Sequence, residues 1–481
     1  MTLNINFMKK LLSVLALYFY ISIQLYSQND TIKYEIGVMG IGSSGVSSPF
    51  WLRANSYGVV SETPFNANFQ AAINKDFGAS SRLFDYGFKA NLLIKKDANK
   101  SELYFHELYA KARFSVFDLI VGSRKETLGN QDSTLSSGGL LFSHNAIPMP
   151  KITIGIEHYT AIPYSDGYLQ VKGALVHGWF SKNAYEQGAY LHHKYAYVRI
   201  GGRLPVNIEY GLNHVGIWGG NIPGLGQQPV SLSDYKSIFF GKSGGTDAPT
   251  GEQINALGNH IISQSLKLDL KISDYKISGY WQNISEDGPI YFICNTLNIP
   301  DGLWGVSIRN SKLPFIKGFL YEYLNTTDQT GPYHDKDGIV YGGGDSYFTN
   351  YIYRSGWTYK SQIIGTAFIS KATFNSDGAL TSLNNRVQVH HFGIEGDVKS
   401  YQYRLLTSFS KNYSSYDGIY YHPIPPEMLR NTSIMLEVKR KFSKIQNIEC
   451  GLVVSGDHGK LFGNSYGGLI SIRKTGDLFK Y

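Results

Sequence analysis

The feature that most constrains the fold is a recurring alternation of side chains with a period of two residues. In residues 266–272, for example, leucine and isoleucine alternate with lysine and aspartate. Because successive side chains of a strand point to opposite faces, this period predicts β-strands rather than helices. Most runs have about 10 residues, the length that a tilted membrane-spanning strand requires. Similar runs occur near residues 83–95, 101–113, 168–180, 191–201, 205–215, 400–412, 429–441 and 446–456.

The connections between these runs differ in length in a regular way. From residue 151 onward short and long connections alternate, provided that 326–383 is one excursion whose apparent strand around Trp357–Phe368 lies outside the wall. This alternation is expected of a barrel with short periplasmic turns and long extracellular loops. The tight turns are predicted at 201–204, 273–274, 396–399 and 442–444, and the long connections at 124–150, 216–260, 285–302, 326–383 and 413–428.

Counting strands in this way gives thirteen from residue 151 onward, four in 66–123 and at least one in 33–60. The predicted fold class is therefore all-β, a transmembrane antiparallel β-barrel of about 18 strands, uncertain by two. A secreted soluble propeller would need a repeat of about 40–50 residues, and none is visible.

The composition agrees with a barrel. Of the 481 residues, 14% are aromatic and only 17% are charged, below the roughly 25% of soluble domains. Mean hydropathy is −0.20, as expected when lumen-facing polar residues alternate with lipid-facing ones. The two cysteines are too few for a disulfide scaffold. The net charge of +8 comes from scattered lysines and arginines, which argues against binding of nucleic acid.

The N-terminus predicts export. Lys9 and Lys10 precede the apolar stretch 11–26, which a polar segment follows, and this is the pattern of a secretory signal. We expect a signal peptide over 1–27, an N-terminal periplasmic segment with the first strand over 28–65, and the outer-membrane barrel over 66–481. An uncleaved anchor is the alternative.

Motifs for cofactors or catalysis are weak. The glycine pattern at 40–45 is followed by Pro49 rather than by the helix that a dinucleotide site needs. The pairs His192-His193 and His390-His391 point to opposite faces of their strands, so neither pair can chelate one ion. Hydrogen bonding in the lumen explains them better. No G-x-S-x-G motif occurs. We expect no cofactor, no metal and no catalysis.

The long connections are rich in aromatic, acidic and amide side chains, which suits carbohydrate binding, because aromatic faces stack on sugar rings while carboxylates and amides bond hydroxyls. The alternative is that these residues form an interfacial aromatic girdle or pack the loops. The predicted glycan-binding candidates are Trp218, Tyr235, Trp281, Trp304, Glu322, Asp328, Asp335, Asp345, Trp357 and Arg386.

An ordered set of short motifs spans nearly the whole chain after the signal: Pro49-Phe-Trp-Leu-Arg53-Ala-Asn-Ser-Tyr57-Gly, Ser143-His-Asn-Ala-Ile-Pro148, His192-His-Lys-Tyr-Ala-Tyr-Val-Arg199, Asn255-Ala-Leu-Gly-Asn-His260, Asp301-Gly-Leu-Trp304-Gly, Tyr321-Glu-Tyr, Thr326-Thr-Asp-Gln-Thr-Gly-Pro332, Gly356-Trp-Thr-Tyr359 and Asn384-Asn-Arg386. Together these motifs resemble a known family, the Wzi-type capsule-assembly proteins of outer membranes.

The resemblance implies an 18-stranded barrel in the cell outer membrane that acts as a surface lectin. It implies binding of capsular or extracellular polysaccharide, help in its attachment or assembly, and no catalysis. The expected partners are that polysaccharide and outer-membrane lipids, with the protein a monomer. The family also has a periplasmic helical N-terminal region, from which the short, Gly/Ser-rich residues 30–48 depart.

Two other functions stay open on the sequence. A barrel of this size is wide enough for the aqueous lumen of a porin or substrate channel, although tyrosine and phenylalanine on both faces of several strands favour a filled lumen. An outer-membrane hydrolase or acyltransferase is the third possibility, for which no motif identifies a catalytic residue.

Overall fold

The computed structural model describes residues 31–78, 82–286, 300–329, 345–374, 380–382, 384–415, 428–442 and 447–480. Two predicted features, the signal peptide over 1–27 and the candidate Asp335, lie outside these residues. The described chain forms one 18-stranded antiparallel sheet that closes on itself, because β1 (Thr31–Ser43) pairs with both β2 (Phe65–Lys75) and β24 (Ser465–Lys480). The predicted fold class and strand number are confirmed.

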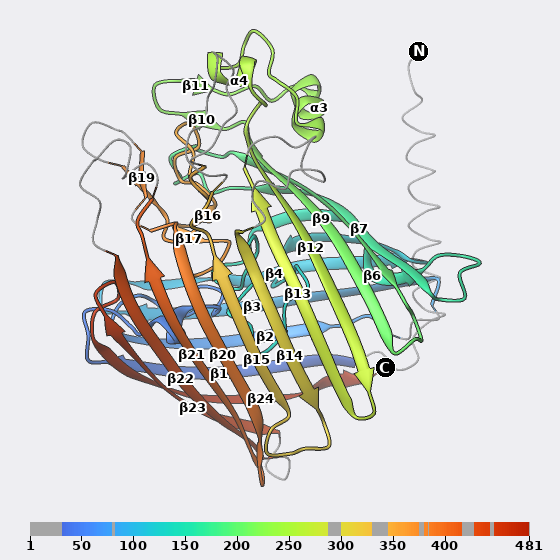
Figure 1. Ribbon diagram of the computed structural model, residues 1–481, viewed down its shortest axis with the longest axis vertical. Coiled ribbons are helices and arrows are strands. Elements are labelled where there is room, and N and C mark those ends of the chain that lie inside the picture. Colours follow the sequence, from blue (N-terminus) through green and yellow to red (C-terminus); the bar gives the residue numbers. More distant parts are fainter. Residues whose placement is uncertain are drawn as a thin grey trace.

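Figure 1 shows the strands crossing the barrel at a steep tilt, with the larger connections gathered at one end. The other strands of the wall are β3 (Phe84–Asp97), β4 (Ser101–Phe114), β5 (Phe117–Ser123), β6 (Pro150–Ala161), β7 (Leu169–Trp179), β8 (Tyr190–Ile200), β9 (Val206–Trp218), β12 (Asn259–Ile272), β13 (Tyr275–Ser285), β14 (Gly302–Asn310), β15 (Gly318–Asn325), β20 (Val387–Val398), β21 (Tyr401–Asn412), β22 (Leu429–Phe442) and β23 (Ile448–Gly459).

The connections alternate between the two ends of the barrel as predicted. Tight turns join β12 to β13 and β20 to β21, where Ser273 and Lys399 take positive φ values of 53° and 57°. The second turn lies at 399–400 rather than 396–399, because pairing between β20 and β21 continues to Val398. We call the end with these turns the short-turn end and the opposite one the long-loop end.

The long connections hold the remaining described helices and small hairpins. The apparent strand around Trp357–Phe368 is a hairpin outside the 18-stranded sheet, as predicted. Within the described residues no helix is long and apolar enough to span a membrane. These elements are α2 (Phe50–Arg53), α3 (Leu232–Phe240), α4 (Thr250–Ile254), and the pairs β10 (Asn221–Ile222) with β11 (Gly226–Gln227), β16 (Thr358–Tyr359) with β17 (Gln362–Ile363), and β18 (Ala372–Phe374) with β19 (Leu380–Ser382).

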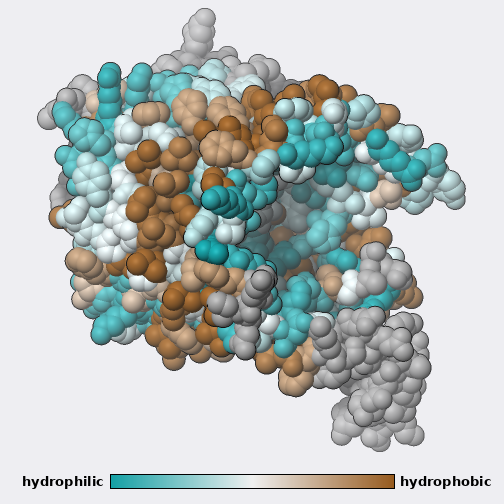
Figure 2. All heavy atoms as spheres, turned by 90° about the horizontal axis from the view of Figure 1, so that it is seen from below, coloured by the Kyte–Doolittle hydropathy of each residue, from teal (hydrophilic) through white to brown (hydrophobic). Residues whose placement is uncertain are grey.

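The two faces of the wall differ in polarity. On the outward face large apolar side chains stay exposed, among them Ile208, Leu266 and Ile470. Figure 2 shows such hydrophobic patches on the surface beside a hollow whose visible walls are mostly hydrophilic. A closed barrel satisfies every backbone hydrogen bond within the sheet, so this apolar face can stand in lipid.

The lumen face is polar and cross-linked by ion pairs. Arg124 pairs with Glu157 at 2.7 Å, and Arg199 pairs with Glu209 at 2.6 Å. The Lys89 ammonium lies 2.6 Å from the Glu107 carboxylate. Burying an unpaired charge is costly, so these ion pairs allow charged side chains to lie on the half-buried lumen face.

Candidate functional site

Three connections from the long-loop end fold back into the lumen and close it. We call this assembly the plug, and it consists of residues 44–64, 124–149 and 345–374. Its apolar side chains form one buried cluster with inward-facing wall residues such as Val215 and Leu320. Trp357, Tyr347, Phe348 and Leu135 are fully buried in it. The described plug residues therefore occupy part of the lumen.

The plug fits closely against the wall because a glycine faces it. A Cβ atom at Gly393 of β20 would lie only 2.8 Å from the Cβ of Leu135. One strand position earlier on the same face, His391 bonds the Leu135 carbonyl through Nε2 at 2.8 Å, and its ring lies 5.1 Å from the ring of Trp51. The wall therefore positions both the first and the second plug segment.

Buried polar groups also fix the plug. Glu322 of β15 is completely buried, and its carboxylate accepts hydrogen bonds from Ser136 Oγ at 2.6 Å, from Ser137 N at 2.8 Å and from the Tyr280 hydroxyl. Gln282 of β13 accepts from Leu140 N at 2.8 Å. Hydrogen bonds to a charged acceptor are among the stronger ones in proteins.

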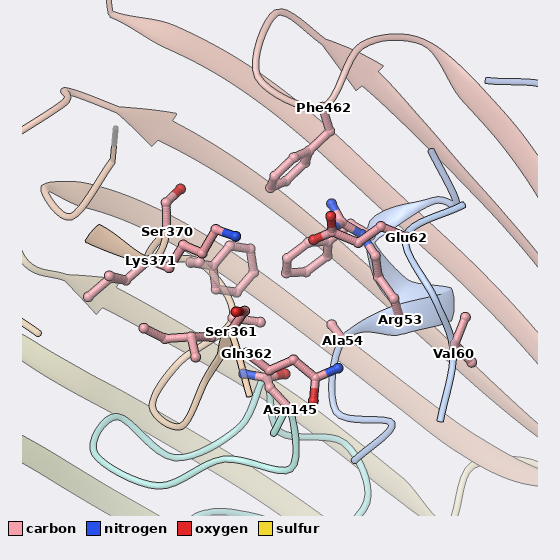
Figure 3. A pocket seen from close by; sticks show the side chains of 15 residues that line it. Arg53, Ala54, Val60, Glu62, Asn145, Ser361, Gln362, Ser370, Lys371 and Phe462 are labelled. Atoms are coloured by element: carbon pink, nitrogen blue, oxygen red, sulfur yellow. The ribbon is translucent and has the colours of Figure 1, made fainter. Parts of the chain in front are cut away.

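The three plug segments and the loop between β23 and β24 line a cavity of about 280 Å³. In Figure 3 Arg53 and Glu62 enter it from one side, Ser370 and Lys371 from the other, and Phe462 from the loop between β23 and β24. We call it the rim pocket; it is lined by Phe50, Arg53, Ala54, Val60, Glu62, Asn145, Ser361, Gln362, Ile363, Ala367, Phe368, Ile369, Ser370, Lys371 and Phe462.

Three phenylalanine rings form the apolar part of the rim pocket. The Phe50 ring stacks on Phe462 with centroids 5.0 Å apart, and it lies 4.8 Å from the Phe368 ring. Phe50 is held in place from behind, because its backbone N–H donates to the Asp457 carboxylate at 2.7 Å. The three rings come from three different connections and meet only because the plug folds inward.

The polar part of the rim pocket offers donors and acceptors. Arg53 Nη1 bonds Glu62 at 3.0 Å, and the Glu62 side chain is 83% exposed. Arg53 Nε is buried without a hydrogen-bond partner in the described part of the chain. Gln362 Oε1 accepts from Ile147 N at 3.0 Å, while Asn145 donates to the Gly365 carbonyl at 2.8 Å. These bonds preset the orientation of both amides.

The sequence-predicted candidates that the structure describes fall into separate places, and none of these described candidates lines the rim pocket. Trp281 and Trp304 pair across β13 and β14 with ring centroids 5.5 Å apart. They alternate with inward-facing Tyr280 and Gln282, so they face outward, where an aromatic girdle would stand.

Two further candidates are structural elements of the plug. Trp357 is fully buried and donates from Nε1 to the Leu141 carbonyl at 2.7 Å. Glu322 is the anchor described above. Trp218 of β9 and Tyr235 of α3 lie 5.6 Å apart in a different cluster.

The remaining candidates gather at one junction of loops. The Asp301 carboxylate accepts from the backbone N–H groups of Asp328 and Gln329 at 3.0 and 2.7 Å, and from the Tyr347 hydroxyl at 3.0 Å. Arg386 Nε donates to the Thr327 carbonyl at 3.0 Å, and Asp345 N donates to the Gln329 carbonyl at 3.0 Å. Burial raises the pKa of Asp301 to about 6.

Sequence reasoning missed the residues that make the rim pocket. Phe50 and Arg53 belong to the motif that begins at Pro49, which pointed to the family rather than to a site. Phe462 stands in a short connection, and Phe368 in a segment without tryptophan or acidic neighbours. A search weighted toward tryptophan and carboxylates in long loops passes over both.

The histidine pairs behave as the alternation predicts. His193 faces the lumen and bonds Asn213 Oδ1 at 3.2 Å, whereas His192 faces outward toward Tyr235. His391 is buried at the plug, whereas His390 faces outward beside Tyr321. In the described residues no group of three or more His, Cys, Asp or Glu side chains is arranged to hold a metal ion.

A closed 18-stranded barrel with an apolar outward face, long loops at one end and a plug in its lumen defines the class of this protein, an outer-membrane β-barrel. The sequence matches the family model for the capsule assembly protein Wzi over residues 46–390. The chain therefore belongs to the Wzi capsule assembly protein family. The comparison with curated proteins gave no match.

The solved structure of Wzi agrees with the fold. Wzi of Escherichia coli, described as an outer membrane protein involved in group 1 capsule assembly and as a carbohydrate-binding β-barrel, is 14% identical with a TM-score of 0.58, covering 94% of this chain and 86% of that one. OccAB2 of Acinetobacter baumannii has a TM-score of 0.49 at 9% identity, covering 94% of this chain and 98% of that one. OccK5 (OpdH) of Pseudomonas aeruginosa has a TM-score of 0.48 at 10% identity, covering 94% and 99%.

Proposed function

We propose that this protein is a non-catalytic surface lectin that binds capsular or extracellular polysaccharide and helps to attach or assemble it at the outer membrane. The observation that carries the proposal is the rim pocket, where three phenylalanine rings and a set of oriented polar groups share one cavity at the long-loop end. Its volume of about 280 Å³ is near the lower limit for sites that take small ligands, which suits one or two residues of a polymer.

The chemistry of the rim pocket matches a sugar ring. The apolar C–H face of a pyranose can lie on Phe462, whose ring is supported from behind by buried Phe50. The hydroxyl groups at the edge of the sugar can bond amides and charged groups such as Gln362, Arg53 and Glu62. Because Arg53 and Glu62 pair with each other, the pocket offers both donors and acceptors without a strong net charge. No bond-breaking step is needed for this role.

Family membership supports the proposal. Wzi of Escherichia coli is described as a carbohydrate-binding barrel involved in capsule assembly. The polar junction around Asp301 and the aromatic pair Trp218 and Tyr235 stay predicted contacts for a long polymer, in addition to the rim pocket. Which polysaccharide is bound is a question for the experiment below.

A channel is the second candidate, and the plug argues against it. A substrate would have to pass a lumen in which Trp357, Leu135 and Tyr347 are fully buried. Steady single-channel conductance of the purified protein in planar bilayers would favour transport, whereas electrical silence fits a lectin.

The direct test is binding of polysaccharide isolated from the surface of the same cells. Purified protein in detergent micelles should bind the polymer, and Phe462→Ala should weaken binding. Trp304→Ala is the matched control, because it removes an outward-facing aromatic ring far from the rim pocket in the fold. If neither the wild type nor the control binds the polymer, the lectin proposal is wrong.

A further inference from the structure

One helix of the barrel packs on the outside of the wall rather than in the lumen. The helix α3 lies in the β9–β12 connection and covers the outward-facing side chains of β8, β9 and β12, among them His192 and His214. The His192 ring lies 5.5 Å from the Tyr235 ring and 5.3 Å from the Phe239 ring. In Figure 1 α3 stands beside the upper ends of these strands.

Specific contacts fix the position of α3 on the wall. Gly216 of β9 faces the helix, and a Cβ atom there would lie 3.2 Å from Ile238 Cγ2. Lys194 of β8 donates from Nζ to the Phe239 carbonyl in the last turn of α3, where the negative end of the helix dipole favours a cation. Its ammonium also lies 3.9 Å from the centre of the Phe239 ring. The helix is therefore docked on the wall.

The acidic side chain of α3, Asp234, is engaged in capping the first turn of the helix. Ser231 and Asp234 form a capping box, in which the Asp234 carboxylate accepts from Ser231 N at 2.6 Å. The exposed charges in and directly after the helix are then those of Lys236 and Lys242. Exposed Asp247 follows further along the same connection, so the positive charge is confined to α3 and the position just after it.

The side of α3 away from the wall is apolar as well as positive. Leu232 is 73% exposed and Phe240 is 58% exposed. This surface lies next to the outward face of the barrel, since exposed Trp179 at the end of β7 pairs with Tyr190, which packs with Trp218 and Tyr235 in the α3 cluster. Large apolar residues flanked by lysines are typical of helices that lie in a membrane interface.

We propose that α3 binds the phosphate-bearing headgroups of outer-leaflet lipid. Leu232 and Phe240 enter the boundary between headgroups and acyl chains, and Lys236 and Lys242 contact phosphates. A soluble partner fits less well, because the surface lies next to the wall that stands in lipid. This inference does not depend on the rim pocket, which no residue of α3 lines.

The position of α3 can be measured with a fluorescent label. In a background with Cys294→Ser and Cys450→Ser, Phe240→Cys is labelled with nitrobenzoxadiazole, and the full chain is reconstituted in phosphatidylcholine vesicles. We expect quenching by lipids with a nitroxide at the headgroup and little quenching by aqueous iodide. Tyr351→Cys, at an exposed plug position, is the control and should respond only to iodide. If position 240 behaves like position 351, the proposal is overturned.

The charge of the site is tested with lipid A as the phosphorylated probe. The detergent-solubilised protein should bind lipid A, and Lys236→Gln with Lys242→Gln should weaken binding about tenfold, because each lysine near a membrane surface contributes measurably to anionic lipid binding. Lys271→Gln with Lys399→Gln removes two exposed lysines at the short-turn end and should leave binding unchanged. Equal binding by the two double variants would contradict the proposal, even if the label at position 240 is near lipid.

Discussion

The indole Nε1 of Trp357 donates a hydrogen bond of 2.7 Å to the backbone carbonyl of Leu141, and this bond joins two plug segments that are more than 200 residues apart in the sequence. The same ring makes an edge contact with Phe142, with centroids 5.5 Å apart. Because Trp357 is fully buried, it is one of the side chains through which the second and third segments share one core.

Trp357→Ala should destabilise the plug strongly. Removing a buried aromatic ring typically costs about 3–5 kcal/mol, and here the Leu141 carbonyl also loses its donor. We expect faster hydrogen exchange in residues 137–149 and 356–366, with little change in the strands of the wall. Trp304→Ala, which removes an outward-facing indole, serves as the control. Unchanged exchange in both plug segments would show that they do not share a core.

Glu322→Ala should release the second plug segment from the wall. It leaves the Tyr280 hydroxyl, Ser136 Oγ and Ser137 N without their acceptor, and each unpaired buried donor costs about 1–3 kcal/mol. We expect the wild type to be electrically silent in planar bilayers and this variant to show intermittent conductance. A wild type with steady open channels would contradict the account of the plug and favour a porin.

The carboxyl group of Glu252 in α4 makes the stability of the connection between β9 and β12 sensitive to pH. Burial raises the pKa of Glu252 from 4.5 to about 7, so the folded loop binds a proton more tightly than the unfolded chain does. Its contribution to stability is full below about pH 4.5 and is lost as the pH rises through about 7. Hydrogen exchange of residues 244–258, corrected for intrinsic rates, should therefore show less protection at pH 8 than at pH 5. In Glu252→Gln the difference should disappear; if it persists, another group causes it.

Much of the fold could be predicted because the alternation within a strand and the length of a connection can both be read from neighbouring residues. The period of two and the alternation of tight and long connections predicted about 18 strands, and the closed sheet has 18. The turn expected at 396–399 was placed too early, since the pattern of side chains does not show where pairing with the next strand stops. Hydrogen bonds continue there to Val398.

The site could not be predicted to the same degree, because it depends on which connections fold inward. Trp357 and Glu322 have the composition of glycan contacts, yet in the structure they hold the plug. The rim pocket forms only where the rings of Phe50, Phe368 and Phe462 come into contact. These residues lie far apart in the sequence, so their contact could not be predicted from it. Several motifs that resemble the family, such as those at Ser143, Asp301 and Gly356, turn out to build the plug and its junctions.

Removing the Phe462 ring from the rim pocket should reduce glycan affinity by the free energy of one aromatic stacking contact. An aromatic stacking contact contributes about 0.5–1.5 kcal/mol, so Phe462→Ala should weaken binding roughly 2- to 12-fold. Phe462→Tyr keeps the ring and should retain most of the affinity. Titration calorimetry with oligosaccharide fragments of the surface polymer measures the difference. Equal loss in both variants would indicate that the loop, and not the ring, is what matters.

The central claim is that the rim pocket holds the surface polysaccharide on the cell. The most direct measurement is retention of that polymer by a deletion strain complemented with the wild type, with Arg53→Ala combined with Phe462→Ala, or with Trp304→Ala, all expressed in the outer membrane to the same level. The account predicts that the wild type and Trp304→Ala restore retention, whereas the double variant releases polymer into the medium. Full retention by the double variant would contradict it.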